Sequence, residues 1–495
     1  MQFPILSLIV FAPLVVAVLL LLMKPERKTE IRVTALAAAV FDLTLSAWVY
    51  YQVYIHPSLE YQFVEKYSWL PALGISYHVG VDGISTPLLL LTGIVMFTGV
   101  LISWGIDDRP REFFAFLFLL AGGVFGVFVS LDLFMLFFFY EIAVFPMYLL
   151  IAIWGWKVTR EYAAMKLTLY LFIGSVFALV GGLAMYFTNY QMHGVLTFDM
   201  LELEKAGFSS NFQYLWFMPV FMGFAILGGI FPFHNWSPDG HVAAPTAVSM
   251  FHAGVLMKLG AFAALRVGIM LLPEGAKQWA WLIFGLAMVN VVYGAFIAMI
   301  QTDLKYVIGF SSVSHMGLVS LGFATLTREG MTGASLQMFS HGVMTALFFA
   351  AVGMVYDRAH TRQIPELGGM SKPLPWVAIA FIIGGLVSMG MPGFSGFVAE
   401  FPIFMGVWKT HWLAAVIASI SIVITAAYVL LAIRRAFFGE VPAQLEGHIG
   451  AISVLDKVAL VTLCLIMITL GVLPNVMVPM VSQGVQNVLR LLGGA

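Results

Sequence analysis

Seven ionisable residues stand inside long apolar runs of this 495-residue chain, where little water can solvate a charge. They are Glu141, His252, Lys258, Lys305, His315, His341 and Glu400. A lysine at the centre of a membrane-spanning helix costs about 2.5–3.5 kcal/mol on insertion scales, so such residues are rare and mark ion or proton pathways. Together the seven predict a path for protons near the middle of a membrane.

Glu141 and Lys258 are the two charged residues most deeply embedded in apolar sequence. Glu141 lies in LFFFYEIAVFPMYLL, and Lys258 lies near the middle of MFHAGVLMKLGAFAALR. A lysine beside Glu141 would favour the ionised carboxylate, so moving that lysine away would raise the affinity of the carboxylate for a proton. Glu141 paired with a nearby lysine would therefore act as a proton switch. A static buried ion pair that joins two helices is the structural alternative.

Three histidines, His252, His315 and His341, extend the predicted path, because imidazole exchanges protons near neutral pH. His252 and Lys258 are six residues apart, roughly 240° around a helix, so they can line successive segments of a path but cannot hold one ion together. A lone membrane histidine can also serve only as a hydrogen-bonding partner between helices. Lys305 lies at one end of its apolar run, where its side chain could reach water.

The amino-acid composition indicates the class of protein that holds these residues. With 61% hydrophobic residues, 10% charged residues and a mean hydropathy of +0.96, the chain is far more apolar than a soluble domain. A net charge of -1 offers no basic field for nucleic acid, and the single cysteine, Cys464, excludes a disulfide framework and a cysteine-ligated metal site. The sequence has no glycine-rich nucleotide loop, nucleophile elbow or HExxH run. We therefore expect a polytopic membrane protein in the lipid bilayer, with no cofactor, no metal and no covalent chemistry of its own.

Apolar length predicts an all-α fold of about fourteen transmembrane helices. The predicted ranges are 3–23, 30–51, 82–104, 112–130, 132–154, 163–188, 212–234, 242–271, 277–300, 304–326, 331–356, 375–405, 411–437 and 456–480. The first range is interpreted as a spanning helix and not as a cleaved signal peptide. The longest connections, at 52–81, 189–211 and 438–455, leave no room for a soluble domain.

Lysine and arginine in the connections predict the orientation, because cytoplasmic loops carry more of them. If the N-terminus is outside, sixteen of these residues lie on the inner side and six on the outer side. The outer six are Lys66, Lys205, Lys277, Arg328, Lys409 and Arg490. Both termini are therefore predicted on the outer side.

Glycine and proline predict that two helices are broken near their centres. Gly228, Gly229 and Pro232 interrupt the seventh helix, and a similar group around Pro392 interrupts the twelfth, eight residues before Glu400. The breaks lie five helices apart, which indicates two inverted five-helix repeats, and matched broken helices point to the ion site of a transporter. General tolerance of glycine and proline in membrane helices is the alternative. The predicted organisation is 1–111 for helices 1–3, 112–271 and 272–437 for the two repeats, and 438–495 for helix 14 and the tail.

Four motifs carry a resemblance to a known family. The runs FFFYEIAVFPMYLLIAIWG, FPFHNWSPDGHVAAPTAVSMFHAGVLMKLGAFAALR, QTDLKYVIGFSSVSHMG and MPGFSGFVAEF resemble the antiporter-like proton-pumping subunits of respiratory complex I, of the subunit M or chain 4 type. The resemblance implies a subunit that translocates protons in the cell inner membrane while neighbouring subunits oxidise NADH and reduce quinone. It also implies a hetero-oligomer with L-type and N-type antiporter-like subunits. The chain ends soon after helix fourteen, which disfavours the L type.

By position, the resemblance assigns roles to several residues. Glu141 resembles the essential glutamate of the fifth helix, Lys258 the central lysine of the eighth, and Glu400 the acid of the broken twelfth helix near the exit. His315 and His341 resemble the central relay histidines.

One departure concerns the lysine that the family places in the seventh helix, nine residues before a tryptophan. Here the tryptophan is Trp236, and the position holds Leu227. Either His252 or His234 substitutes, or Glu141 is tuned from elsewhere, or this unit pumps differently. A subunit of a multisubunit cation/proton antiporter or of a membrane-bound hydrogenase, and a structural spacer without pumping, are the alternative functions.

Overall fold

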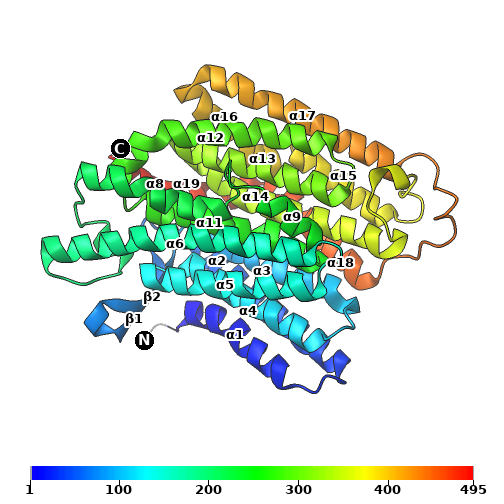
Figure 1. The fold of residues 1–495 in the computed structure, drawn as a ribbon, viewed down its shortest axis with the longest axis horizontal. Coiled ribbons are helices and arrows are strands. Elements are labelled where there is room, and N and C mark those ends of the chain that lie inside the picture. The colour runs from blue at the N-terminus through cyan, green and yellow to red at the C-terminus, as the bar shows by residue number, and fades with distance from the viewer. Residues whose placement is uncertain (1–2, 494–495) are drawn as a thin grey trace.

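The computed structural model describes residues 3–493 as a bundle of long helices that lie side by side, with one β-hairpin at an end of the bundle (Figure 1). Within the described residues, twelve helices are long and apolar enough to cross a membrane. Eleven of them are α1 (Ile5–Leu22), α2 (Lys28–Ile55), α3 (Ser85–Ile102), α4 (Pro110–Val129), α5 (Leu133–Trp154), α6 (Arg160–His193), α12 (Pro273–Ile300), α13 (Leu304–Ala324), α14 (Arg328–Ala359), α17 (Trp412–Phe437) and α18 (Val454–Val472). The all-α membrane architecture predicted from apolar length is confirmed.

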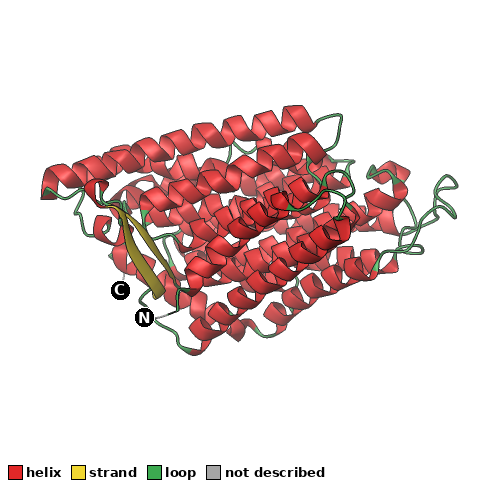
Figure 2. Ribbon diagram, turned by 90° about the horizontal axis from the view of Figure 1, so that it is seen from below, coloured by secondary structure: helices red, strands yellow, loops and turns green. Residues whose placement is uncertain are grey.

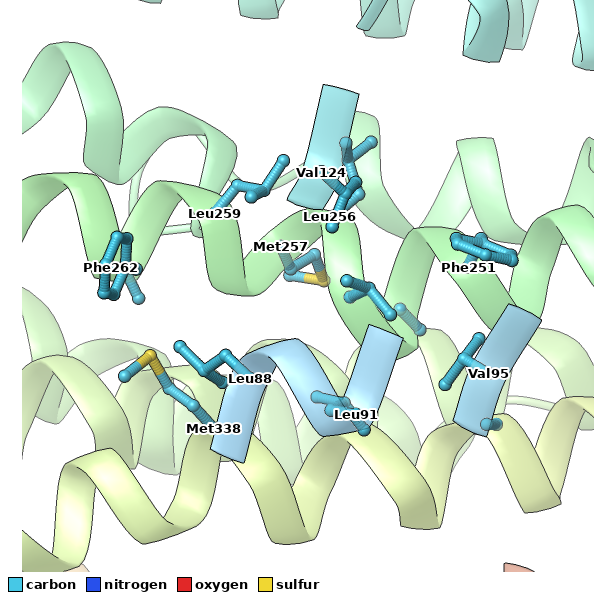
Figure 3. Close-up of a cluster of buried hydrophobic side chains, with 14 of the residues drawn as sticks. Leu88, Leu91, Val95, Val124, Phe251, Leu256, Met257, Leu259, Phe262 and Met338 are labelled. Carbon is cyan, nitrogen blue, oxygen red and sulfur yellow. The ribbon is translucent and has the colours of Figure 1, made fainter. Parts of the chain in front are cut away.

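The twelfth span is a composite helix at the centre of the bundle. It consists of α10 (Thr246–Phe251), a π-helical turn η3 (His252–Leu256), α11 (Met257–Ala263) and a second π-helical turn η4 (Ala264–Ile269). Side chains of α3, α4 and α14 pack around it (Figure 3). The cluster includes Leu88, Leu91, Val95, Val124, Phe251, Leu256, Leu259, Phe262 and Met338. A helix that is apolar on all sides is buried, so Lys258 lies inside protein and not in lipid.

Two further helices are each broken into two pieces. The first consists of α8 (Ser210–Leu227) and α9 (Trp236–Ala243), and the second consists of α15 (Pro375–Ser388) and α16 (Ser395–Thr410). Gly229 and Gly390, with φ of 77° and 63°, adopt the left-handed conformation at the breaks, which a residue with a Cβ rarely adopts. The breaks lie where the glycines and prolines predicted them. The total of fourteen crossings and the inverted repeat remain predictions.

The boundaries around the first break were predicted wrongly. The predicted helix 212–234 ends at Leu227, and the polar segment that follows is helical as α9, which contacts α6 and α13. A polar stretch such as SPDGH reads as a loop, but here neighbouring helices bury it. The predicted helix 242–271 begins only at Thr246.

The end of the bundle that carries both termini also carries the hairpin (Figures 1 and 2). Strands β1 (Gln62–Leu70) and β2 (Ile75–Val81) are antiparallel, with Lys66 opposite His78, in a segment predicted as an irregular connection. Helix α7 (Met200–Leu203) and the amphipathic helix α19 (Val478–Leu491) lie at the same end, and the predicted helix 456–480 instead stops at Val472. We call this the hairpin end and the opposite end the loop end. Short 3₁₀ turns complete the structure: η1 (Pro71–Leu73), η2 (Ser103–Gly105), η5 (Ile364–Glu366) and η6 (Pro474–Val476).

Candidate functional site

Lys258 is the centre of the buried polar groups. Its side chain is fully buried, and its Nζ lies 2.8 Å from Nδ1 of His341 on α14. The same ammonium donates a hydrogen bond to the carbonyl of Ala253, in the π-helical turn just before it. π-helical turns are rare and occur often at functional sites. The turn therefore helps to hold the lysine head group against the histidine.

A second set of contacts continues from His341 to Glu400. The rings of His341 and His315 have centroids 5.4 Å apart, and Nδ1 of His315 lies 3.1 Å from Oε1 of Glu400. The amide of Gln337 donates to the same carboxylate oxygen at 3.0 Å, and Nε2 of His315 lies 3.0 Å from the hydroxyl of Ser388. Lys258, two histidines and a glutamate thus form a row of proton-exchanging groups across α11, α14, α13 and α16.

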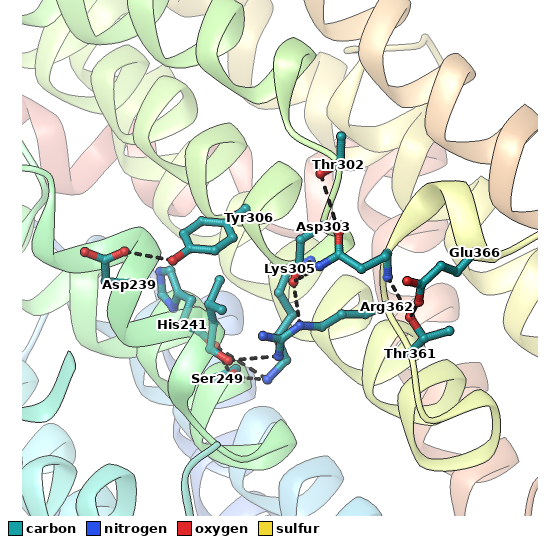
Figure 4. A network of polar contacts seen from close by, with 12 residues as sticks. Asp239, His241, Ser249, Thr302, Asp303, Lys305, Tyr306, Thr361, Arg362 and Glu366 are labelled. Carbon is teal, nitrogen blue, oxygen red and sulfur yellow. Dashed lines mark hydrogen bonds and ion pairs between the residues drawn. The ribbon is translucent and has the colours of Figure 1, made fainter. Parts of the chain in front are cut away.

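A third group lies beside α9, toward the loop end (Figure 4). Lys305 donates from Nζ to the carbonyl of Ala244 at 2.7 Å and reaches the hydroxyl of Ser249 at 3.3 Å. Ser249 in turn donates to the carbonyl of His241, whose ring centroid is 4.0 Å from that of His252. Lys305 and His252, both predicted site residues, are therefore joined through His241.

Glu141 is the predicted site residue that the structure leaves apart. Its side chain is exposed on α5, on the same helix face as Phe138 and Phe145, which are 43% and 60% exposed. Between residues 3 and 493 no ion pair to Glu141 is found. Leu227, at the position where the resemblance implies a lysine, is fully buried as the last residue of α8. No hydrogen bond links Glu141 to His252 in the described part of the chain, so the proposed substitution by this histidine remains a prediction.

Three residues of the candidate site were not predicted from the sequence: two are uncharged, and one lies in a polar stretch between two predicted helices. Gln337 and Ser388 carry no charge and therefore gave no signal, although both contact His315. His241 lies in the stretch interpreted as a polar loop, and its imidazole contacts the hydroxyl of Ser237 at 3.0 Å. A search for any buried polar side chain, charged or not, would have found these residues.

A separate ionic cluster lies at the hairpin end, outside the spanning helices. Oδ2 of Asp199 accepts from Lys66 of β1 at 2.6 Å and lies 3.0 Å from Nδ1 of His78 on β2. Burial alone would raise the pKa of Asp199, but the contacts with His78 and Lys66 outweigh it and lower that pKa to about 2. An isolated bridge pairs Asp199 with Asp132, the N-cap of α5. The cluster thus fixes the hairpin to the end of the helix that carries Glu141.

Comparisons with known proteins agree with the all-α membrane fold. Residues 130–425 match the family described as NADH:quinone oxidoreductase/Mrp antiporter, TM. The chain is 38% identical over 446 residues to NAD(P)H-quinone oxidoreductase chain 4 2 of Microcystis aeruginosa, covering 89% of this chain and 80% of that one. It is also 38% identical over 445 residues to NAD(P)H-quinone oxidoreductase chain 4 of Gloeobacter violaceus, covering 88% and 83%.

Solved structures are similar over the whole length. A chain of respiratory complex I from Thermus thermophilus with bound NADH superposes with a TM-score of 0.90 at 27% identity, over 99% of this chain and all of that one. A chain of the Mrp complex from Dietzia sp. superposes with a TM-score of 0.87 over all of both chains; at 20% identity it shows the fold alone. The chain therefore belongs to the NADH:quinone oxidoreductase/Mrp antiporter family of membrane subunits.

Proposed function

We propose that this chain is a proton-translocating membrane-arm subunit of a complex I-type quinone oxidoreductase, in which buried ionisable groups carry the protons. The observation that supports this most directly is the row from Lys258 through His341 and His315 to Glu400. The 2.8 Å contact between Lys258 and His341 is a hydrogen bond between two groups that can each hold the shared proton, so a proton can be transferred along it. Relatives at 38% identity are NAD(P)H-quinone oxidoreductase chains, which supports the assignment to such a complex.

The proton steps follow from the contacts. Protonated Lys258 donates toward Nδ1 of His341, and the imidazole can pass a proton on through its other ring nitrogen. His315 then carries the proton toward Glu400, whose carboxylate it contacts directly. Gln337 and Ser388 hold His315 and Glu400 in position. The chain supplies the path, and electron transfer in other subunits supplies the energy.

Glu141 belongs to the proposal as a residue that modulates the path from outside the row. It lies on α5 without an ion pair in the described residues, so any effect on Lys258 acts through its field or through a neighbouring subunit. The resemblance to chain 4 proteins supports L-type and N-type neighbours in the membrane arm. The excess of lysine and arginine at the loop end supports an inner position for that end and an outer position for both termini.

The test is the Lys258→Met variant of the complete complex, reconstituted in proteoliposomes. Quinone reduction and proton uptake are measured together, so that pumping is expressed per electron. We expect pumping through this subunit to stop, because methionine keeps the volume of the side chain but cannot carry a proton. Lys409→Met is the matched control, since Lys409 pairs with Glu329 at an exposed site. Equal proton-to-electron ratios in the two variants would contradict the proposal.

The family description also includes Mrp antiporters, and a chain of an Mrp complex has the same fold. This supports a second candidate function, in which the subunit exchanges protons for another cation. A subunit of a hydrogenase-type complex is a further alternative and is tested in the same way. The composition of the detergent-purified complex separates these functions: NADH-oxidising flavin and iron–sulfur subunits support the first, whereas nickel–iron hydrogenase subunits or small antiporter subunits support the second.

A further inference from the structure

A cavity of about 310 Å³ lies at the loop end, where the connection between α12 and α13 and the turn η5 meet the end of α17. Its volume is roughly ten times the 30 Å³ that a water molecule occupies in the liquid, so a phosphate group fits inside. Six residues line it: Gln301, Thr302, Ile364, Pro365, Leu367 and Arg435. Among the described residues, Arg435 is the only charged one in this wall.

The two connections that form most of the wall are joined to each other. The amide of Ile364 donates to the carbonyl of Thr302 at 2.7 Å, and an isolated bridge pairs Asp303 with Gln363. The hydroxyl of Thr302 lies 3.4 Å from Oε1 of Gln363, which is long for an O–H donor, so a closer acceptor would replace this contact. The wall is therefore fixed before a ligand binds, and it retains a hydroxyl donor.

Arg435 has no partner within the described part of the chain. Its side chain is exposed, and between residues 3 and 493 it forms no ion pair and no side-chain hydrogen bond. Glu366, the acid of η5, already accepts from the hydroxyl of Thr361. A guanidinium presents five N–H donors in a planar fork that matches a phosphate group. The wall therefore complements an anion from outside the chain.

The helices beside the cavity place it at the depth of lipid head groups. Helix α17 lies at the edge of the bundle and contacts α12 (Figure 1). Exposed apolar side chains continue along α12 to its last residue, Ile300, which is 66% exposed. On α17 they continue to Leu431, and Arg435 follows one turn later. Such a change from apolar to basic side chains within one turn is typical of the boundary between acyl chains and head groups.

We propose that this cavity binds the head group of an anionic phospholipid, with the phosphate on Arg435 and Thr302 and the acyl chains along α12 and α17. A soluble anion would use the arginine but not the apolar surfaces of the two helices, so the position of the cavity favours a lipid. A lipid bound there would hold the end of α17 against the connection between α12 and α13. Binding requires no proton pumping, so the site can be tested without turnover.

Photolabelling of the complete complex in proteoliposomes tests the proposal. The probe is phosphatidylglycerol with a diazirine near the glycerol backbone, and phosphatidylcholine with the same diazirine is the zwitterionic comparison. After illumination and digestion, mass spectrometry measures the label on residues 301–302 and 364–367, relative to exposed residues 412–417 at the opposite end of α17. Arg435→Gln removes the guanidinium. Arg434→Gln is the matched control, because Arg434 is exposed and adjacent but does not line the cavity.

We expect phosphatidylglycerol to label the cavity about fivefold more than phosphatidylcholine, the preference that one arginine confers at an anionic membrane surface. Arg435→Gln should remove this preference, and Arg434→Gln should keep it. The comparison of the two lipids in the unmodified complex needs no variant, so it decides the question even if Arg435→Gln does not assemble.

Four results would overturn the proposal. Equal labelling by the two lipids in the unmodified complex would show that the cavity does not select an anionic head group. An equal loss of preference in both variants would indicate a general effect of charge at the end of α17. Displacement of the label by inorganic phosphate would assign the cavity to a soluble anion. Absence of label on residues 301–302 and 364–367, with normal label on residues 412–417, would show that a neighbouring subunit covers the cavity.

Discussion

Replacing Asp199 by asparagine should loosen the hairpin end. The carboxylate is buried, with a side-chain exposure of 4%, and it holds three groups at once. Oδ2 contacts Lys66 and His78 on the two strands, and Oδ1 accepts from the amide of Leu201 at 3.0 Å to cap α7. Asparagine can keep the cap through its amide oxygen, but it loses the negative charge that the two basic side chains require.

The lowered pKa gives the size of the effect. The pKa of Asp199 falls from 3.8 to about 2, because contacts with His78 and Lys66 outweigh the cost of burial. At about 1.36 kcal/mol per unit, this shift corresponds to roughly 2 kcal/mol. Lys66 is half exposed, so solvent screening reduces the expected loss to about 1–2 kcal/mol. Because the folded-state pKa lies below the unfolded value, this stabilisation is complete above about pH 4 and is lost as the pH falls toward 2.

Hydrogen exchange at pH 7 measures the prediction where the stabilisation is fully present. The amides of β1 and β2 should exchange about five- to thirtyfold faster in Asp199→Asn than in the unmodified protein. Glu202→Gln on α7 is the control, since Glu202 is exposed and forms no ion pair in the described residues. Equal exchange of the hairpin in both variants would show that the cluster does not hold the strands.

Three other substitutions test ionisable and polar groups of the helix bundle. Glu141→Gln should lower pumping per electron in proteoliposomes while the complex still assembles, because glutamine is nearly isosteric but carries no proton; unchanged pumping would make Glu141 structural. Gln337→Leu removes a donor 3.0 Å from Glu400 and a contact of His315, and a lost hydrogen bond to a charged group costs about 1.5–3 kcal/mol. Proton transfer through this subunit should slow by about ten- to a hundredfold with quinone KM unchanged, so the proton-to-electron ratio should fall by the share of this subunit; a ratio like that of the unmodified complex argues against this role. Asp42→Asn should preserve pumping and assembly, because both carboxylate oxygens of buried Asp42 lack hydrogen-bond partners in the described structure; loss of pumping would reveal a second proton site.

The membrane helices and the two helix breaks could be predicted, because each depends mainly on residues close together in the sequence. Apolar length indicates a membrane helix, and the glycines near Pro232 and Pro392 mark the two breaks, where Gly229 and Gly390 have positive φ. Helix α9 could not be predicted in this way, because its polar sequence is helical only when α6 and α13 cover it. The hairpin was missed for a related reason: the alternation in QFVEKYSWL is weak beside the strong apolar signals on either side.

The site was predicted as a set of residues but not as a set of contacts. Charge inside apolar sequence marks Lys258 and Glu400 without any structure. The contact between Lys258 and His341 joins residues 83 positions apart, and helical periodicity says which side of a helix a residue faces but not which helix lies opposite. Gln337 carries no charge, so only the structure reveals that it bridges His315 and Glu400.

A residue can influence proton transfer along the row either by direct contact or from a distance, and the position of Glu141 distinguishes the two. Lys258 contacts His341, His315 contacts Glu400, and the two imidazole rings lie 5.4 Å apart between centroids, so removing one of these groups interrupts the row itself. Glu141 touches none of them, and Leu227 fills the place from which a lysine would connect it. Its influence on the row then acts through its electric field or through a neighbouring subunit; for a separation of about 10 Å and an effective dielectric near 20, one charge would be worth roughly 1.7 kcal/mol. Such a field changes a proton affinity by about twentyfold. Loss of Glu141 should therefore slow proton transfer along the row, whereas loss of Lys258 should stop it. Comparing the two variants distinguishes an effect that acts at a distance from an interruption of the path.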